Sequence, residues 1–265
     1  MTYFTVNTRL AFGVDLSRYN TSADGNQKVN FDVLRAHQPQ VVFAGLRAGI
    51  SWGYQDPWFN YYFNEAQRTG ILSLPYHVVY PAEDPAAQMD HFLRIVGEER
   101  LTACRLVLDM ELVHGLTRAR ITRCLQTCLK LLKVRTGRLP IVYSRASWVD
   151  EHLAVADLPE VDWWLAQYRT PRTYPLFTPE YASPPTLPAG VNRWLLHQAA
   201  EKAPAIGAEG CHYMDYNRWN GTREDVWRYF DLARPLACPL DGAACPTRFE
   251  PLDEAAIALH LMQYR

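Results

Sequence analysis

The chain has 265 residues, 48% of them hydrophobic and 21% charged, with 27 Lys and Arg against 28 Asp and Glu. This is the composition of a folded globular protein, long enough for one large domain, and it excludes disordered and fibrous chains. The net charge of −1 provides no field to attract polyanions, and no run reaches the ~18 apolar residues of a membrane span, so we expect neither nucleic-acid binding nor a membrane span.

Short apolar runs alternate along the chain with longer segments of helical period, a pattern typical of a parallel α/β sheet. Eight strands are predicted, at 12–16, 41–47, 72–79, 105–111, 140–144, 162–168, 193–198 and 211–216. Helices are predicted between the first six strands, at 29–37, 58–69, 84–97, 117–136 and 146–153. Eight is the number of strands that closes such a barrel.

The pattern changes after the sixth strand. Residues 169–192 are rich in Pro, Tyr and Ser and show no helical period, and residues 199–210 are too few for a crossover helix. We therefore predict an irregular TIM-like α/β barrel of eight strands and about five helices, in which five β/α units are followed by three strands, (β/α)5(β)3. With a last helix at 222–232, the barrel domain spans residues 11–232, and residues 233–265 form a tail or linker that includes a short helix.

The six cysteines form no CxxC pair, so neither a zinc ribbon nor a disulfide scaffold is expected. Cys124 and Cys128 are four apart in a predicted helix and are expected in the core. Cys238 and Cys245 flank a loop of Pro, Gly and Ala, and for them both a disulfide and two free thiols stay open.

Four acidic residues stand at the predicted carboxyl ends of strands, where barrels of this kind carry their active sites. They are Asp15, Asp109, Glu111 and Asp215. Because charged side chains are rarely buried without partners, their position at the ends of apolar strands indicates a polar cavity. The same strands carry polar or aromatic residues suited to ligand contact, namely Arg47, Tyr76, Tyr143, Trp164, Tyr168 and Gln198.

The run LVLDMEL is the most specific feature among these residues. Residues two apart in a strand project to the same face, so Asp109 and Glu111 are expected to face one space. A nearby anion and an apolar wall both disfavour ionisation, so one carboxyl is expected to stay protonated near neutral pH while the other is charged. Glycoside hydrolysis requires such a pair, an acid for the leaving oxygen and an anion for the cationic sugar.

Metal binding is the strongest alternative, since Asp15, Asp109, Glu111 and Asp215 could hold Mg²⁺ or Ca²⁺ through oxygen. The aromatic residues favour a sugar, because their faces stack on pyranose rings, although each taken singly is also explained as a core residue. Three histidines near the predicted mouth are explained by local hydrogen bonding and receive no catalytic role: His77, His114 and His197.

The order of the motifs resembles glycoside hydrolase family 25, the Chalaropsis-type lysozymes or N-acetylmuramidases. The resemblance covers about residues 11–230 and is carried by GVDLS, DPWFNYYFNEAQRTGI leading into PYHVV, AAQMDHFLRIVG, LVLDMEL, LPIVYS, WWLAQY, WLLHQ and YMDYNRW. It implies an irregular barrel of eight strands and five helices. It also implies hydrolysis of the β-1,4 bond between N-acetylmuramic acid and N-acetylglucosamine in peptidoglycan, without a metal or cofactor.

By the same resemblance, Glu111 is the general acid and Asp109 is its partner, which orients the substrate's 2-acetamido group or stabilises the cation. Asp15 and Asp215 match two further acids lining the cleft. The sugar-contact positions are matched by Tyr76, Tyr143, Trp164, Tyr168 and Gln198.

Three features of the chain depart from the family pattern. After the second strand, 47–51 reads Arg-Ala-Gly-Ile-Ser, so an acidic residue usual in the family is absent and a sugar subsite can differ. Val78 replaces an aromatic residue, and the tail after 231 matches nothing in the family core. The alternative function is a saccharide- or peptidoglycan-binding module that keeps the barrel without turnover.

The implied partner is the bacterial peptidoglycan glycan strand, bound by a monomer that acts outside the cell or on the cell wall. The first residues, MTYFTVNTRLAF, have neither a basic n-region nor a continuous apolar h-region, so no signal peptide is expected in this chain. A phage endolysin and a domain of a longer protein are both compatible with this expectation.

Overall fold

The computed structural model describes residues 10–21, 26–168, 183–211 and 213–231. Its strands form one sheet in the order β1-β9-β8-β7-β6-β5-β4-β2-β3, and β1 also pairs with β2. This last pairing closes the sheet into a barrel of eight strands, with the two-residue β3 as an appendage on β2. The strands are β1 (Phe12–Leu16), β2 (Val41–Ile50), β3 (Tyr54–Gln55), β4 (Leu72–Val78), β5 (Val107–Asp109), β6 (Ile141–Ser144), β7 (Trp163–Ala166), β8 (Leu196–Pro204) and β9 (Tyr213–Trp219).

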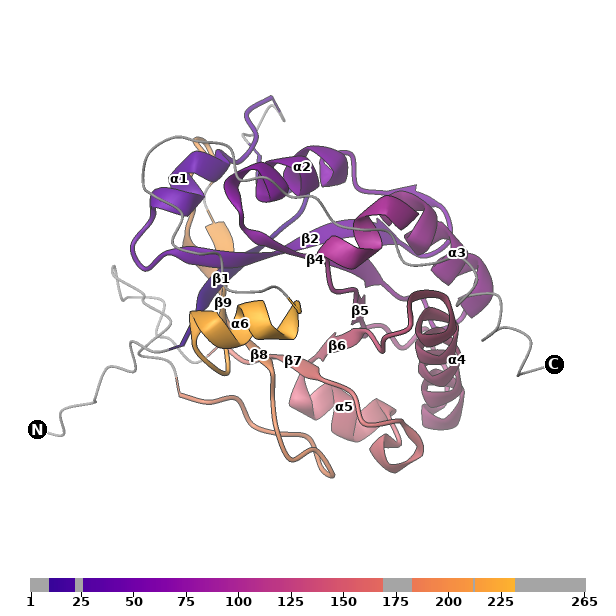
Figure 1. Ribbon diagram of the computed structural model, residues 1–265. Helices are drawn as coiled ribbons and strands as arrows, with labels where there is room; N and C mark the ends of the chain where they lie inside the picture. Colours follow the sequence, from indigo (N-terminus) through magenta and orange to yellow (C-terminus); the bar gives the residue numbers. More distant parts are fainter. Residues whose placement is uncertain (1–9, 22–25, 169–182, 212, 232–265) are drawn as a thin grey trace, which may run out of the picture.

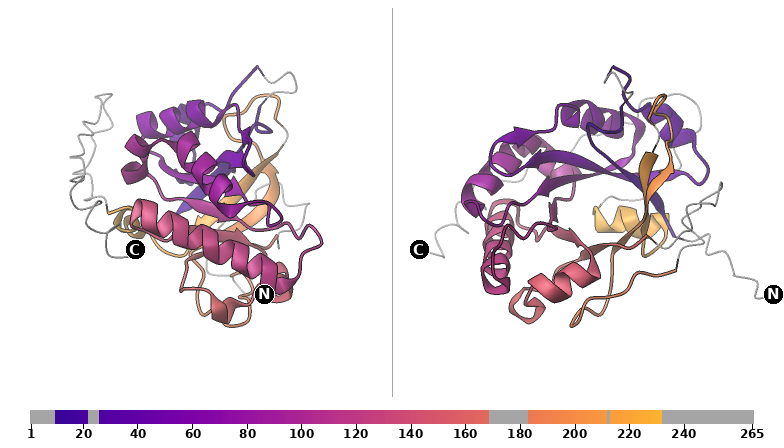
Figure 2. Two further views of the ribbon diagram at one scale, coloured as in Figure 1. Left: turned by 90° about the vertical axis from the view of Figure 1, so that its right-hand side faces the viewer. Right: turned by 180° about the vertical axis from the view of Figure 1, so that it is seen from behind.

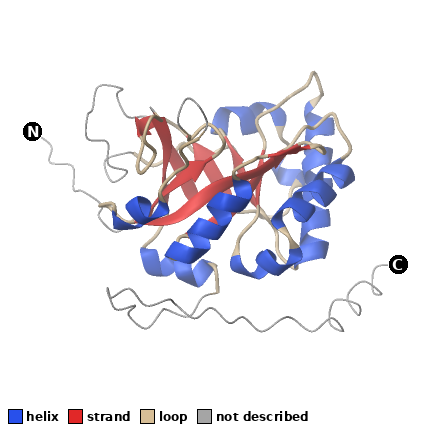
Figure 3. Ribbon diagram, turned by 90° about the horizontal axis from the view of Figure 1, so that it is seen from above, coloured by secondary structure: helices blue, strands red, loops and turns tan. Residues whose placement is uncertain are grey.

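Helices cover the outside of the barrel, as Figure 3 shows with blue helices around red strands. The α-helices are α1 (Phe31–Ala36), α2 (Phe59–Thr69), α3 (Pro85–Val96), α4 (Arg118–Thr136), α5 (Ala146–His152) and α6 (Arg223–Tyr229). The predicted order of five β/α units followed by three strands is confirmed. The structure adds two short 3-10 helices, at Glu98–Ala103 and Val155–Asp157.

Local sequence explains where these helices begin and end. The side chain of Asp84 accepts a hydrogen bond from the backbone of Ala86 at the start of α3, where Pro85 occupies the first turn. The longest helix, α4, faces the viewer in the left panel of Figure 2 and ends at Gly137, whose φ of 73° belongs to the left-handed region. Cys124 and Cys128 of α4 are buried free thiols, as predicted.

The prediction of a wholly parallel sheet is wrong for the last strand. β9 runs antiparallel to both β8 and β1, and the other barrel pairings are parallel. The physical reason is the short β8–β9 connection, which allows a hairpin but no crossover. As a result, the start of β9, and not its end, lies beside the carboxyl ends of the other strands.

The barrel interior is filled by apolar side chains and closed at one mouth by α6, which crosses the ring of strands in Figure 1. Val226 and Phe230 belong to the same buried cluster as the interior residues Phe43, Trp164 and Trp219. Because this mouth is blocked, only the opposite mouth, at the carboxyl ends of the parallel strands, is left for a site.

Gly13→Ala is expected to destabilise the barrel by about 1–3 kcal/mol, since overpacking forces side chains and backbone to move. A Cβ at position 13 would overlap the ring of Phe43 in the interior. Urea unfolding measures the effect. Gly53→Ala is the matched control, because a Cβ there meets no atom within 4 Å; equal loss of stability in both variants would contradict the packing argument.

Within the part of the chain that the structure describes, no helix is both long and apolar enough to cross a bilayer. The proposed tail 233–265, with Cys238 and Cys245, lies outside the described residues.

Candidate active site

Two of the predicted acids face each other directly across a strand pair. Asp15 of β1 and Asp215 of β9 are partners in the antiparallel register. Asp15 stands near the carboxyl end of β1, and Asp215 stands near the start of β9 because that strand is reversed. The two carboxyl groups therefore meet at the open mouth of the barrel.

Gln198, at the third position of β8, joins these acids to two tyrosines. Its amide nitrogen donates to Oδ2 of Asp15 at 2.8 Å and to Oδ2 of Asp215 at 3.3 Å. Its amide oxygen accepts from the hydroxyl of Tyr143 at 2.8 Å and from that of Tyr168 at 2.9 Å. Gln198 is buried, so this network holds the four side chains in one arrangement.

Trp164 lies beneath this network. Its indole nitrogen donates to Oδ1 of Asn217 at 2.8 Å, and Nδ2 of Asn217 donates to Oδ2 of Asp15 at 2.7 Å. Gly45 makes room for this packing, since a Cβ there would lie 2.6 Å from the Trp164 ring and 2.7 Å from Cβ of Asp15. Trp164 is only 2% exposed, so it has no free face for a sugar and instead supports Asp15.

Asp109 and Glu111 differ in their surroundings. Asp109 ends β5 and is 8% exposed, and its Oδ1 has no hydrogen-bond partner among the described residues. Glu111 lies just beyond the strand, with 32% of its side chain exposed, and its Oε1 is 3.3 Å from Nε of Arg145. One carboxyl is thus enclosed, while the other faces the opening and an arginine.

The pKa values of the four acids are all raised, first by burial. For Asp109 the pKa lies well above its usual value because burial is reinforced by the charges of Glu111 and Asp15. The pKa of Glu111 is also raised by burial, but Arg145 opposes the rise. Asp15 thus acts on both Asp109 and Glu111, and it is joined to Asp215 of β9 through Gln198.

Asp215 and Asp15 form an unequal pair. Burial, the charge of Asp15 and a hydrogen bond with it raise the pKa of Asp215 to about 9. Burial also raises the pKa of Asp15, but hydrogen bonds from Asn217 and Gln198 favour its charged form. At neutral pH Asp215 therefore keeps its proton and Asp15 is the better acceptor.

Arg47 and Tyr76 form the wall on the β2–β4 side. Nε of Arg47 lies 2.8 Å from Oδ2 of Asp56, whose side chain is fully buried. Burial raises the pKa of Tyr76 well above its usual value, and the charges of Asp15 and Asp109 add to the shift. Arg47 is thus already paired, while Tyr76 lies beside the acids.

The three histidines do not join the acids. His77 stacks on Phe92 with 5.0 Å between ring centroids, and burial lowers its pKa to about 3, so it is neutral. His114 packs on Tyr80 with 4.6 Å between centroids. His197 contacts the backbone oxygen of Gln167 through Nε2.

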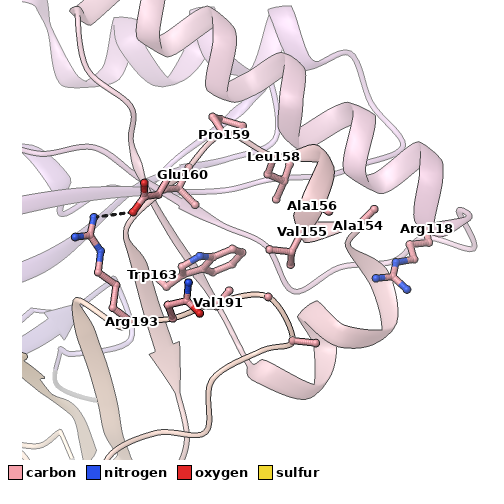
Figure 4. Close-up of a pocket in the computed structure, with 14 residues that line it drawn as sticks. Arg118, Ala154, Val155, Ala156, Leu158, Pro159, Glu160, Trp163, Val191 and Arg193 are labelled. Atoms are coloured by element: carbon pink, nitrogen blue, oxygen red, sulfur yellow. Dashed lines mark ion pairs between the residues drawn. The ribbon is translucent and has the colours of Figure 1, made fainter.

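Among the described residues, no three His, Cys, Asp or Glu side chains are grouped in a way that could hold a metal ion. A separate hollow of about 560 Å³, shown in Figure 4, lies at the connection from α5 to β7. Its one acidic residue, Glu160, is paired with Arg193 at 3.4 Å. This hollow offers no pair of carboxyl groups for acid–base chemistry.

Arg145 and the role of Asn217 were not foreseen from the sequence. Arg145 directly follows β6, so extending the search one residue past each strand would have found it. Asn217 stands two residues after Asp215 in the same strand and so shares its face.

Comparison with known proteins places this arrangement in a family. The family model "Glycosyl hydrolases family 25" matches residues 14–207. A curated relative, the uncharacterized protein YegX of Escherichia coli O6:H1, is 26% identical over 219 residues, which are 83% of this chain and 73% of YegX.

Two solved structures share the fold. A family 25 glycosyl hydrolase from Bacillus anthracis has a TM-score of 0.68 at 18% identity, covering 88% of this chain and 97% of its own. A bacterial lysozyme from Streptomyces coelicolor has a TM-score of 0.65 at 22% identity, and the match covers 86% of this chain and 98% of the lysozyme chain. Since the family model matches most of the chain, including three of the four clustered acids, this protein belongs to glycosyl hydrolase family 25 and is a glycoside hydrolase.

Proposed function

We propose that the protein is a muramidase that hydrolyses the β-1,4 bond between N-acetylmuramic acid and N-acetylglucosamine in bacterial peptidoglycan. The observation that carries this proposal is the pair Asp109 and Glu111, one enclosed and one at the opening, beside the pair Asp15 and Asp215. Two carboxyl groups with unequal environments at one site provide an acid and an anion.

Glu111 is the general acid in this proposal, because its carboxyl group is more accessible than that of Asp109. Its proton passes to the glycosidic oxygen as the bond to the anomeric carbon breaks. Asp109 lies behind it, enclosed and with no hydrogen bond at Oδ1 among the described residues, and in this proposal its carboxyl group orients the 2-acetamido group of the substrate. The acetamido oxygen, or a water molecule, then meets the positive charge at the anomeric carbon.

Asp15 and Asp215 contribute to the electrostatic potential at the site in this proposal. A charged Asp15, held by Gln198 and Asn217, favours the cationic transition state without needing to move. Tyr168, which is 38% exposed, offers an aromatic face, while Tyr76 and Tyr143 offer hydroxyl groups near the acids. Arg47, bound to Asp56, shapes the wall of the site.

Membership of a glycoside hydrolase family disfavours the alternative of a peptidoglycan-binding module without turnover, although the ion pair between Glu111 and Arg145 would hold Glu111 ionised. An ionised Glu111 cannot donate a proton. Dye release from labelled peptidoglycan distinguishes the two functions, since only a hydrolase releases soluble dye.

The identity of the bond is tested by mass spectrometry of fragments released from purified peptidoglycan. A muramidase leaves the new reducing end on N-acetylmuramic acid. A new reducing end on N-acetylglucosamine would overturn the proposal, and so would intact polymer after incubation with folded protein.

A further inference from the structure

Arg145 occupies a position at the opening of the site that its contacts do not fully explain. It is the first residue after β6, which pairs with β5, the strand that ends at Asp109 two residues before Glu111. Its side chain is 57% exposed, and its Nε is 3.3 Å from Oε1 of Glu111. Among the described residues, this ion pair is the one polar contact of the guanidinium. Its two terminal NH2 groups contact no described polar atom and can therefore donate to a ligand.

This ion pair is easily broken. Half-exposed pairs between an arginine and a carboxylate contribute about 0–1 kcal/mol, because water and side-chain entropy offset the attraction. A second carboxylate can therefore replace Glu111 on Arg145 at little cost. An arginine is well suited to this exchange, since its planar group binds carboxylates through two parallel hydrogen bonds.

The pair also opposes the proposed chemistry while it lasts. The positive charge of Arg145 favours the ionised form of Glu111, whereas a proton donor must be protonated. The other groups facing Glu111 are Asp109 on β5, Asp15 on β1, Asp215 on β9 and Tyr143 on β6, and the charge of Asp15 raises the pKa of Glu111. Arg145 is thus the counter-charge whose removal would return the proton to Glu111.

We propose that Arg145 binds a carboxylate carried by the muramyl residue of the substrate, and that this exchange frees Glu111 to act as the acid. The inference rests on the proposed muramidase function and adds to it a substrate preference for carboxylate-bearing glycan. A muramyl residue can present such a group as its lactyl carboxylate or within an attached stem peptide. No covalent step is involved, since Arg145 changes partners and Glu111 takes a proton from solvent or from Asp109.

The test compares three soluble muramyl glycans: one with free lactyl carboxylates, one with stem peptides, and one whose lactyl carboxylates are converted to amides. Wild-type enzyme is expected to show about tenfold higher kcat/KM on a carboxylate-bearing glycan than on the amide, the effect of one charge-assisted hydrogen bond. Preference for the peptide-free carboxylate identifies the lactyl group as the ligand. Preference for the peptide-bearing glycan alone identifies the stem peptide.

Arg145→Gln is expected to abolish this preference, so that kcat/KM becomes the same on the carboxylate-bearing and amide glycans. Arg145→Lys keeps the charge and should retain part of the preference. The matched control is Arg193→Gln, which removes another exposed arginine from ion pairs with Glu160 and Asp162 beside the separate hollow. This control should keep the full preference.

The pH profile gives a readout that a merely structural role would not change. The alkaline limb of kcat/KM reports the pKa of the general acid in the free enzyme. The alkaline limb of kcat reports the pKa of the same acid in the enzyme–substrate complex. For the wild-type enzyme on the carboxylate-bearing glycan, the alkaline limb of kcat should lie about one pH unit above the alkaline limb of kcat/KM, because Arg145 has left Glu111 in the complex. In Arg145→Gln both limbs should coincide at the higher pH.

The inference is overturned if Arg145→Gln keeps the wild-type preference or leaves the alkaline limb of kcat/KM in place. Failure of the muramidase proposal itself looks different, since wild-type enzyme would then cleave none of the three glycans.

Discussion

Glu111→Gln is expected to lower kcat on peptidoglycan by about 10²- to 10⁴-fold, the usual contribution of a positioned general acid. The substitution keeps the size of the side chain but removes the proton that the glycosidic oxygen needs. The fold should be retained, because the side chain lies at the opening and, among the described residues, pairs with the exposed Arg145 alone. Turnover is measured by release of reducing ends from purified cell walls.

Glu65→Gln is the matched control, since Glu65 lies on the outer helix α2 and pairs with the exposed Arg68. It should retain full activity. A Glu111→Gln enzyme with wild-type turnover would show that another group donates the proton and would remove Glu111 from the mechanism.

Asp215→Asn is expected to stabilise the protein at alkaline pH by several kcal/mol, since each unit of a pKa shift corresponds to about 1.4 kcal/mol. The pKa of Asp215 is raised from 3.8 to about 9 on folding, so between these values the folded state holds a proton that the unfolded chain releases. The associated stability is fully present below about pH 4 and is lost as the pH rises toward about 9. Asparagine does not titrate, so the variant avoids this loss.

Urea unfolding of wild type and Asp215→Asn from pH 4 to pH 9 measures this difference. The two proteins should be similar in stability at pH 4 and diverge steadily as the pH increases. Asp90→Asn, which removes an exposed partner of Arg135, is the control and should change stability by less than about 0.5 kcal/mol. A difference that is constant across this range would contradict the raised pKa of Asp215.

The substitution also illustrates why these acids cannot be explained as stabilising elements. Burial raises the pKa values of Asp15, Asp109 and Asp215, and the charge of Asp15 adds to the rise for Asp109 and Asp215. Such an arrangement costs folding free energy and is found where chemistry requires it. We therefore expect Asp215→Asn to lose turnover while it gains stability.

Much of the site was predictable because the relevant patterns are local. Hydrophobic period distinguished strands from helices, and the end of each strand located Asp15 and Asp109 at one mouth of the barrel. The spacing of Asp109 and Glu111 predicted that both face one space, but β5 ends at Asp109 and Glu111 lies two residues beyond it, outside the strand to which that spacing rule applies. These features depend on neighbours within a few residues, which a single sequence contains.

The tertiary structure alone decided the features that depend on distant partners. The reversal of β9 put Asp215 opposite Asp15, Gln198 became the link between both acids and two tyrosines, and Trp164 was buried beneath them instead of facing a sugar. It also brought Arg145 to Glu111, 34 residues apart in the chain. Periodicity indicates which side of a strand is buried, but only the closing of the whole barrel selects which side chains meet inside it, because that choice depends on pairing and packing between segments far apart in sequence.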